Sequence, residues 1–215
     1  MSPAMPAQRP GCAAPADPRI DQVLAFWLGA APPTDASALA CKTQWFTKSD
    51  AFDAQIRTRF GSLIEQARAG QLDGWAASPL GRLALVLLLD QFTRNAYRGT
   101  PASFAGDAQA LALAQEGLAN GHGAALPLVA RTFLLLPLEH AEDPALQALC
   151  VAAFTALLAQ ATPATQALLA GGLDYAQQHQ ALIARFGRFP HRNAILGRSS
   201  TPAERAYLAQ PGAGF

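Results

Sequence analysis

The chain has 215 residues, of which 51% are hydrophobic, and its sixteen Lys and Arg against fifteen Asp and Glu leave a formal net charge of only +1. This length suits one compact domain with a hydrophobic core of its own. The near balance of charge argues against a general nucleic-acid binder, and therefore against DNA as a partner, because such proteins carry a strongly basic face. Any basic site must be local.

The three cysteines, Cys12, Cys41 and Cys150, show no C-x-x-C spacing. The sequence therefore predicts neither a disulfide framework nor a zinc site, and a reducing cytoplasm fits best. The longest strongly apolar run, LALVLLL at 83–89, is far shorter than the ~20 residues that cross a bilayer. We expect a soluble, cytoplasmic protein without a metal, a cofactor or a membrane partner.

The first eighteen residues hold five of the sixteen prolines and no apolar run long enough for a signal peptide. We interpret residues 1–18 as a disordered Pro/Ala-rich tail, residues 19–210 as a single helical domain, and residues 211–215 as a short C-terminal tail.

Helical periodicity recurs along the chain without sustained two-residue alternation, which predicts an all-α fold. The first helix is expected over 20–28, ending at Gly29, and a weak helical stretch follows near 35–44. The next begins after Ser49 and ends at Gly70. Its apolar face consists of Phe52, Ile56, Phe60, Leu63 and Ala67.

Prolines that follow Ser, Thr or Asp mark the starts of most later helices. The expected ranges are 79–92, 101–119, 127–135, 144–160, 163–187 and a short helix from 202, for which T-P-A-E at 201–204 is a capping-box match. The 79–92 helix is apolar on every side and should be central. Pro137 should interrupt the 127–135 helix, and Gly171-Gly172 should bend the 163–187 helix.

About eight helices joined by short turns predict a right-handed stack of antiparallel helical hairpins, similar to tetratricopeptide repeats. A strict 34-residue repeat is absent. One internal similarity stands out, because FTRNAYRGTPA at 92–102 resembles FPHRNAILGRSSTPA at 189–203.

The segment RFGRFPHRNAILGR at 185–198 gathers four arginines. Pro190 prevents these arginines from forming one helical stripe, so the preceding helix should end near Gly187 and the arginines should fan out around a turn. Interleaved aromatic and aliphatic residues should anchor this segment in the core. A buried guanidinium without a partner costs several kcal/mol, so each arginine needs an opposite charge.

Two interpretations of these charges stay open. In the first, the carboxylates Asp90, Glu139 and Glu142 neutralise the arginines, with Asp90 and Arg94 paired four residues apart and Asp107 and Asp174 as further candidates. In the second, neutralisation is incomplete and the remaining guanidiniums face a cleft that takes a phosphate or carboxylate. The candidate ligand-binding residues are Arg94, Asn95, Arg98, Arg185, Arg188, Arg192, Asn193 and Arg198.

Three histidines lie near these charged residues, and imidazole serves as a general acid or base near neutral pH. The candidate catalytic residues are His191, His140, His179, Glu139 and Asp90. A histidine taken alone is more often a hydrogen-bonded packing residue, and no spacing resembles a metal-binding H-E-x-x-H.

Several motifs together resemble the bacterial family known as domain of unknown function 924. They are FWLG at 26–29, WF at 45–46, LLLDQFTRNAYRG at 87–99, LPLEHAE at 136–142, RFGRFPHRNAILGRSST at 185–201 and PAERAYL at 202–208. The resemblance spans about residues 20–210 and implies a cytosolic, all-helical, tetratricopeptide-like fold, but no particular activity. Thr93 stands where the family pattern D-Q-F-P-R-N has proline.

The sequence thus favours a cytosolic helical protein whose Arg/His/carboxylate pocket binds or processes a small anionic ligand, and leaves open whether it is an enzyme. The alternative is a helical-repeat adaptor for a peptide or protein partner. RNA binding through the C-terminal arginines is disfavoured by the balanced charge and by their anchoring.

Overall fold

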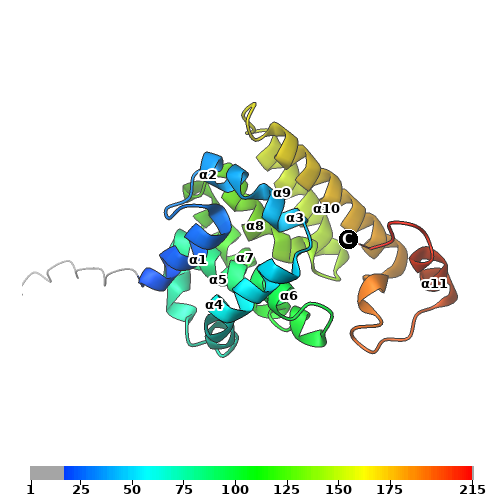
Figure 1. Cartoon of the computed structure of the whole chain (residues 1–215). Helices are drawn as coiled ribbons and strands as arrows, with labels where there is room; N and C mark the ends of the chain where they lie inside the picture. The colour runs from blue at the N-terminus through cyan, green and yellow to red at the C-terminus, as the bar shows by residue number, and fades with distance from the viewer. Residues whose placement is uncertain (1–16, 215) are drawn as a thin grey trace, which may run out of the picture.

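The computed structural model describes residues 17–214, so the part of the expected N-terminal tail before Asp17 lies outside the described residues. The described chain is helical without strands, which confirms the all-α fold (Figure 1), and eight of its helices have seven or more residues. Helix α1 (Pro18–Leu28) starts within the range expected to be a tail, because Asp17 caps it and Pro18 fits its first turn.

The N-terminal helices follow the expected order. After α1 come α2 (Asp35–Ala40), α3 (Lys42–Phe46) and α4 (Asp50–Arg68), and the Ser49 side chain accepts a hydrogen bond from the Phe52 amide at the start of α4. The predicted apolar face of α4 is confirmed, since Ile56, Phe60 and Ala67 are buried. A short 3-10 helix, η1 (Asp73–Ala77), leads to the central helix.

The central helix is one continuous rod with a change of winding in its middle. It comprises α5 (Pro79–Val86), a π-helical segment η2 (Leu87–Phe92) and α6 (Thr93–Ala96). Residues 81–90 are all buried, which confirms its central position. The π-helical winding is not visible in the apolar pattern, and such segments often mark functional positions.

The prediction of one helix over 101–119 is wrong for its first turns. The chain forms a 3-10 helix, η3 (Pro101–Phe104), and then starts anew as α7 (Asp107–Ala119). Gly106 separates the two, and a Cβ atom at this position would lie only 2.2 Å from the Leu89 carbonyl oxygen. The close approach to the central helix therefore decides where α7 begins.

Two expected interruptions do not occur. Helix α8 (Leu128–Glu139), which follows η4 (His122–Ala125), continues through Pro137 to Glu139, although the proline lacks the amide that would bond to the carbonyl four residues earlier. Helix α10 (Gln166–Phe186) starts three residues later than expected and runs through Gly171-Gly172 without a break. A Cβ atom at Gly172 would lie 2.8 Å from the Phe154 ring of α9 (Pro144–Leu158), so this glycine allows close packing of α9 and α10.

Helices α9 and α10 lie side by side along one flank of the body, and the C-terminal segment extends from the end of α10 (Figure 1). This segment begins at Gly187, whose φ is 71°, and contains η5 (Pro190–Arg192) and the capping-box helix α11 (Pro202–Leu208). The described part of the expected C-terminal tail folds back, since the Gly214 amide donates to the Tyr207 hydroxyl at 3.1 Å.

The largest hydrophobic core joins α1, α4, the central helix and α8, with Trp27, Phe60 and Phe92 fully buried in it. A second core lies between α8, α9 and α10, and a small one surrounds Phe189. Within residues 17–214, no helix is both long and apolar enough to cross a membrane.

Candidate functional site

Asp90 lies in the π-helical segment and connects two elements that are far apart in sequence. Its buried carboxylate Oδ1 is 2.9 Å from Arg94 Nη1 and 2.7 Å from His140 Nδ1, at the C-terminal end of α8. The expected Asp90–Arg94 pair is therefore present. Burial opposes ionisation, but the charge of Arg94 and the contact with His140 outweigh it and hold the pKa of the Asp90 carboxyl below its usual range. Asp90 is a fixed anion beside an imidazole.

Asp107, in the first turn of α7, is shared by two arginines. Arg94 binds it with both ends of its guanidinium, at 2.9 Å and 3.1 Å. Arg192 reaches it only through Nη1, at 3.5 Å. Both guanidiniums also lie over the Phe104 ring, at 5.8 Å and 4.9 Å from its centroid. These two arginines occupy matching positions in the similar segments 92–102 and 189–203.

Arg192 is the least neutralised of the buried arginines. Its side chain is only 8% exposed, and its Nε is buried without a hydrogen-bond acceptor in the described structure. Burial and the nearby charge of Arg94 lower its pKa to about 10, so it stays protonated at neutral pH. A second aromatic ring, that of Phe189, lies 4.6 Å from the guanidinium carbon.

Arg188 and Arg198 are neutralised within the protein. Arg198 donates to both carboxylate oxygens of Glu142, at 2.6 Å and 2.9 Å, and Glu142 also accepts the Phe189 amide at 2.8 Å. Arg188 binds Glu204, the capping-box residue of α11, at 2.6 Å and 2.8 Å. Glu142, the partner of Arg198, is one of the carboxylates that the internal-neutralisation interpretation named, whereas Glu204, the partner of Arg188, is not.

Other expected ligand-binding residues lie elsewhere. Asn95 and Arg98 both bind Asp53 of α4, at 2.7 Å and 2.6 Å, and so belong to a different cleft. Arg185 is exposed, and its guanidinium carbon lies 4.7 Å from the Phe186 ring centroid. Asn193 is buried and donates to the Ser200 hydroxyl at 3.1 Å, which places it inside the C-terminal segment.

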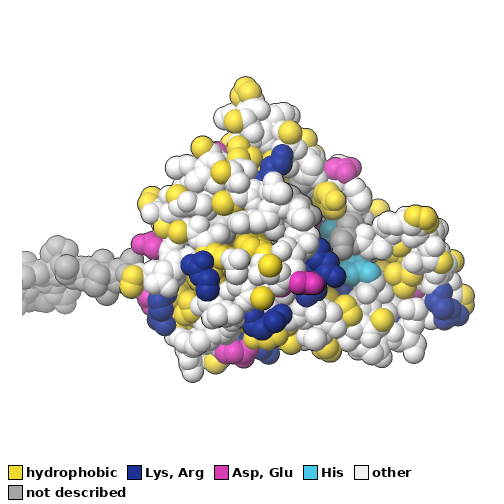
Figure 2. All heavy atoms as spheres, viewed as in Figure 1, with side chains coloured by type: hydrophobic (Ala, Val, Ile, Leu, Met, Phe, Trp, Pro, Cys, Tyr) yellow, Lys and Arg dark blue, Asp and Glu magenta, His cyan; other side chains and the backbone are white. Residues whose placement is uncertain are grey.

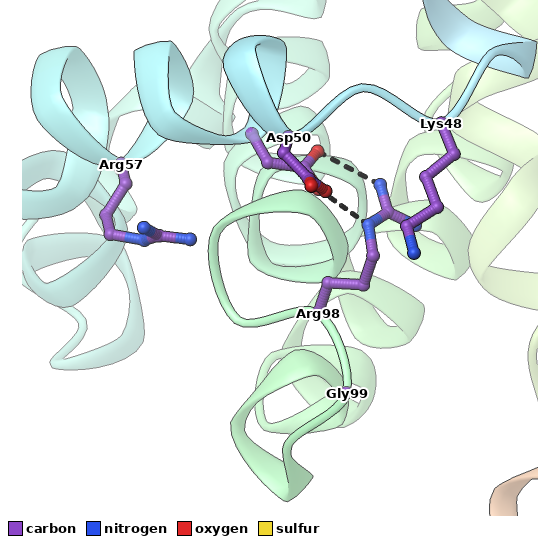
Figure 3. A pocket seen from close by; sticks show the side chains of 6 residues that line it. Lys48, Asp50, Arg57, Arg98 and Gly99 are labelled. Atoms are coloured by element: carbon purple, nitrogen blue, oxygen red, sulfur yellow. Dashed lines mark hydrogen bonds and ion pairs between the residues drawn. The ribbon is translucent and has the colours of Figure 1, made fainter.

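The cleft that Arg98 and Asp53 line has a volume of about 360 Å³ and lies at the start of α4 (Figure 3). The Arg98–Asp53 pair crosses it, and Lys48, Asp50, Arg57 and Gly99 also line it. Arg57 donates through Nε to the Ala96 carbonyl at 3.0 Å.

Glu139 and His179 form a buried pair behind His140. Burial and the charge of Asp90 raise the pKa of Glu139 to about 8. Burial, together with the charge that His140 gains when it is protonated in acid, lowers the pKa of His179 to about 3. Both groups are therefore neutral near pH 7, and the 3.4 Å contact between His179 Nδ1 and Glu139 Oε1 is not an ion pair. His179 Nδ1 donates instead to the Tyr175 carbonyl at 2.8 Å.

His191 lies in η5, the short 3-10 helix that follows α10. Burial and the charge of Arg192 lower its pKa to about 4. Its ring centroid is 5.6 Å from that of Phe189. His191 is therefore neutral at pH 7 and, unlike His140, does not line the cleft described next.

A cleft of about 420 Å³ opens beside His140, between α7, the end of α8 and η5, and we call it the His140 cleft. Figure 2 shows histidine side chains at the surface next to cationic ones where the C-terminal segment joins the body. The polar side chains lining the cleft are Asp107, His140, Glu142, Asp143 and Arg192, and the apolar ones include Leu111, Pro137 and Leu146.

The contact of His140 Nδ1 with Asp90 makes Nε2 the ring nitrogen that a ligand in the cleft can reach. Burial and the charge of Arg94 lower the pKa of His140, so its ring is neutral at pH 7 and able to accept a proton. Among residues 17–214, no three His, Cys, Asp or Glu side chains are grouped to hold a metal ion.

Two residues that contact Arg192 had little or no signal in the sequence. Asp107, which lines the cleft, was only a secondary candidate, and Phe104, whose ring lies under both guanidiniums outside the cleft lining, was not a candidate. Nothing near Phe104 in the sequence distinguishes it from an ordinary packing residue. The similarity of 92–102 to 189–203 was the available hint that Arg94 and Arg192 have a common environment.

A family model described as "Bacterial protein of unknown function (DUF924)" matches residues 23–212. A solved structure described as a protein of unknown function, ATU0120 from Agrobacterium tumefaciens, is 37% identical, with a TM-score of 0.76. The likeness covers 90% of this chain and 99% of that one. Among proteins with curated functions, none matches. The chain therefore belongs to the bacterial DUF924 family.

Proposed function

We propose that this protein binds a small anionic ligand in the His140 cleft, in the cytoplasm, and that Arg192 holds the anion. The observation that carries the proposal is the state of Arg192, a buried guanidinium whose Nε has no acceptor. Its one carboxylate contact, at 3.5 Å, is at the long limit of a hydrogen bond, and Arg94 already occupies both oxygens of that carboxylate. A buried cation that is incompletely paired within the protein favours the binding of an anion from solution.

The Asp90–His140 pair supports processing of the ligand as well as binding. A carboxylate bonded to Nδ1 of a histidine fixes the tautomer in which Nδ1 carries the proton and Nε2 is free to accept one. Because His140 and Arg192 line the same cleft, a ligand held by Arg192 lies within the region where His140 acts. We therefore assign His140 as the proton acceptor and Asp90 as the residue that orients it.

The adaptor alternative requires a continuous exposed apolar surface. In the described structure the exposed large hydrophobic residues are Leu149, Tyr175 and Leu196, with exposed fractions of 45%, 52% and 37%. They lie on α9, on α10 and after η5, and they do not outline a groove. The charged side chains that line the His140 cleft support a pocket for a small ligand more than they support an adaptor surface.

Thermal unfolding at constant ionic strength tests the proposal. Millimolar phosphate, acetate and succinate are compared with chloride, and at least one of the three should raise Tm by a few °C in proportion to the logarithm of its concentration. Arg192→Gln should abolish this increase. Arg185→Gln, which removes the same charge from an exposed position, should preserve it. A Tm that none of the three anions changes relative to chloride overturns the proposal.

A further inference from the structure

We infer that the ligand of the His140 cleft is a small monocarboxylate with a short apolar body, an inference that rests on the proposed function. Three features of the cleft lead to this class rather than to phosphate: the balance of charges around it, the way the Arg192 guanidinium is held, and the helix start at its edge.

The charges of the cleft suit a single negative charge. Arg192 is the one cation among its lining residues, whereas Asp107, Glu142 and Asp143 are acids. Arg94 and Arg198 behind the lining compensate Asp107 and Glu142. The three acids of the lining and these three arginines thus sum to zero, so a ligand adds its whole negative charge to the cleft, and the nearby carboxylates repel a monoanion less than a dianion.

The Arg192 guanidinium can bind a ligand only through the edge of its plane. The Phe104 and Phe189 rings lie at 4.9 Å and 4.6 Å from its central carbon, so aromatic surfaces cover it, and Nη1 is directed to Asp107. The donors that remain lie in the guanidinium plane. A carboxylate binds such an edge with both of its oxygens, whereas a phosphate bound there in the same way has further oxygens that need donors elsewhere.

The helix start beside the cleft does not supply those further donors. Helix α9 begins after Asp143, and amides at a helix start commonly bind phosphate. Here Asp143 Oδ1 already accepts from the Ala145 and Leu146 amides, at 2.8 Å and 3.0 Å. The Leu111, Pro137 and Leu146 side chains instead provide an apolar wall, which suits a hydrocarbon body attached to the carboxylate.

Titration of the purified protein at pH 7 and constant ionic strength tests this inference, with sodium butyrate, sodium acetate and sodium phosphate as probes. Two-dimensional NMR of the histidine ring nitrogens and isothermal calorimetry report binding. Butyrate should bind at least tenfold more tightly than phosphate and more tightly than acetate, and it should shift the His140 Nε2 resonance. Arg192→Lys keeps the charge but lacks coplanar donors, so it should reduce butyrate affinity at least tenfold, whereas Arg185→Lys should leave it unchanged.

The outcomes separate this inference from the proposed function. Phosphate that binds as tightly as butyrate, and loses affinity in Arg192→Lys, overturns the carboxylate class while the anion site stands. Butyrate binding that Arg192→Lys does not weaken overturns the inference, because the site is then elsewhere. If Arg192→Lys does not fold, the wild-type protein alone tests the inference. A His140 resonance that does not shift at saturating butyrate then overturns it. No binding of any probe overturns both.

Discussion

Arg94 and Arg192 meet at one carboxylate, that of Asp107, although 98 positions separate the two arginines in the numbering of the chain. The shared contact joins the end of the central helix to the turn that follows α10, with α7 between them. The two similar segments, 92–102 and 189–203, are thus linked by a third element, rather than through Asp90, Glu139 or Glu142 as the neutralisation interpretation supposed.

Asp107→Asn should reduce the free energy of unfolding by about 1.5–3 kcal/mol, the range for hydrogen bonds to charged groups. The variant removes the charge that Arg94 and Arg192 share and leaves two cations close together. Urea unfolding followed by circular dichroism measures the change. Asp174→Asn, at an exposed position on α10, serves as the control and should change stability by less than about 0.5 kcal/mol. Equal effects of the two substitutions would show that Asp107 has no special role.

Glu142→Gln should loosen the turn after α10. Glu142 accepts the Phe189 amide and both donors of Arg198, so its carboxylate holds the turn to the end of α8. Hydrogen exchange measured by mass spectrometry should become faster in peptides covering residues 187–200, with little change in α4. Glu116→Gln is the matched control, since its carboxylate binds Arg82 but is 63% exposed. Unchanged exchange at 187–200 would contradict this role.

Glu139→Gln should stabilise the protein increasingly as pH rises. The pKa of Glu139 is raised to about 8 in the folded protein, so between about pH 4.3 and pH 8 the unfolded chain binds fewer protons at this group. The contribution of Glu139 to stability is fully present below the unfolded pKa. As pH rises it is lost by at most about 1.4 kcal/mol per pH unit, and the loss ends near pH 8. Gln stays neutral and avoids this loss.

Urea unfolding of the wild type and Glu139→Gln at pH 5.5, 6.5, 7.5 and 8.5 gives the measurement. The stability difference should grow up to about pH 8 and then level off. Glu116→Gln should show no such growth. A difference that is the same at all four pH values would mean that Glu139 is already ionised in the folded protein.

His179→Gln should weaken the loss of stability in acid. The pKa of His179 is lowered to about 3, so below about pH 6.5 the unfolded chain binds a proton that the folded protein does not. Stability from this group is therefore present above pH 6.5 and is lost as pH falls towards 3. The slope of unfolding free energy against pH between 4.5 and 6 should decrease by at most about 1.4 kcal/mol per pH unit in the variant.

Gln177→Ala, an exposed substitution on the same helix that does not titrate, should keep the wild-type slope. The slope, rather than stability at one pH, is the readout, because replacing a buried side chain changes stability by itself. A variant slope equal to that of the wild type would show that His179 is protonated in the folded protein.

Features set by neighbouring residues were predictable from the sequence. The Ser78, Asp143 and Thr201 side chains each cap the helix whose start they predicted, because capping involves only the next three residues. The Asp90–Arg94 pair is present for the same reason, since it depends on helical spacing alone. Pro190 indeed lies after the end of α10, in a turn that carries Arg192.

Features set by packing were not predictable. Thr100-Pro101 and Thr162-Pro163 carry the same local signature as the correct starts, yet they open a 3-10 helix and a turn. Gly106 ends the first of these because it touches the central helix backbone, a contact that no local pattern encodes. The position of Asn95 and Arg98 outside the His140 cleft was not predictable for a related reason, because Asp53, their partner, lies more than forty positions away.

The π-helical winding of Leu87–Phe92 lies between two α-helical parts of the central rod. Beyond it, Arg94 binds Asp107 beside the His140 cleft, and Arg98 binds Asp53 in the cleft at the start of α4. A π-helical turn holds about one residue more than an α-helical turn, so deleting one residue within η2 would restore α-helical winding and leave Arg94 and Arg98 facing nearly the same directions. The surplus residue of this short stretch therefore sets the positions of its own side chains, that of Asp90 among them, rather than the directions of the two arginines that follow.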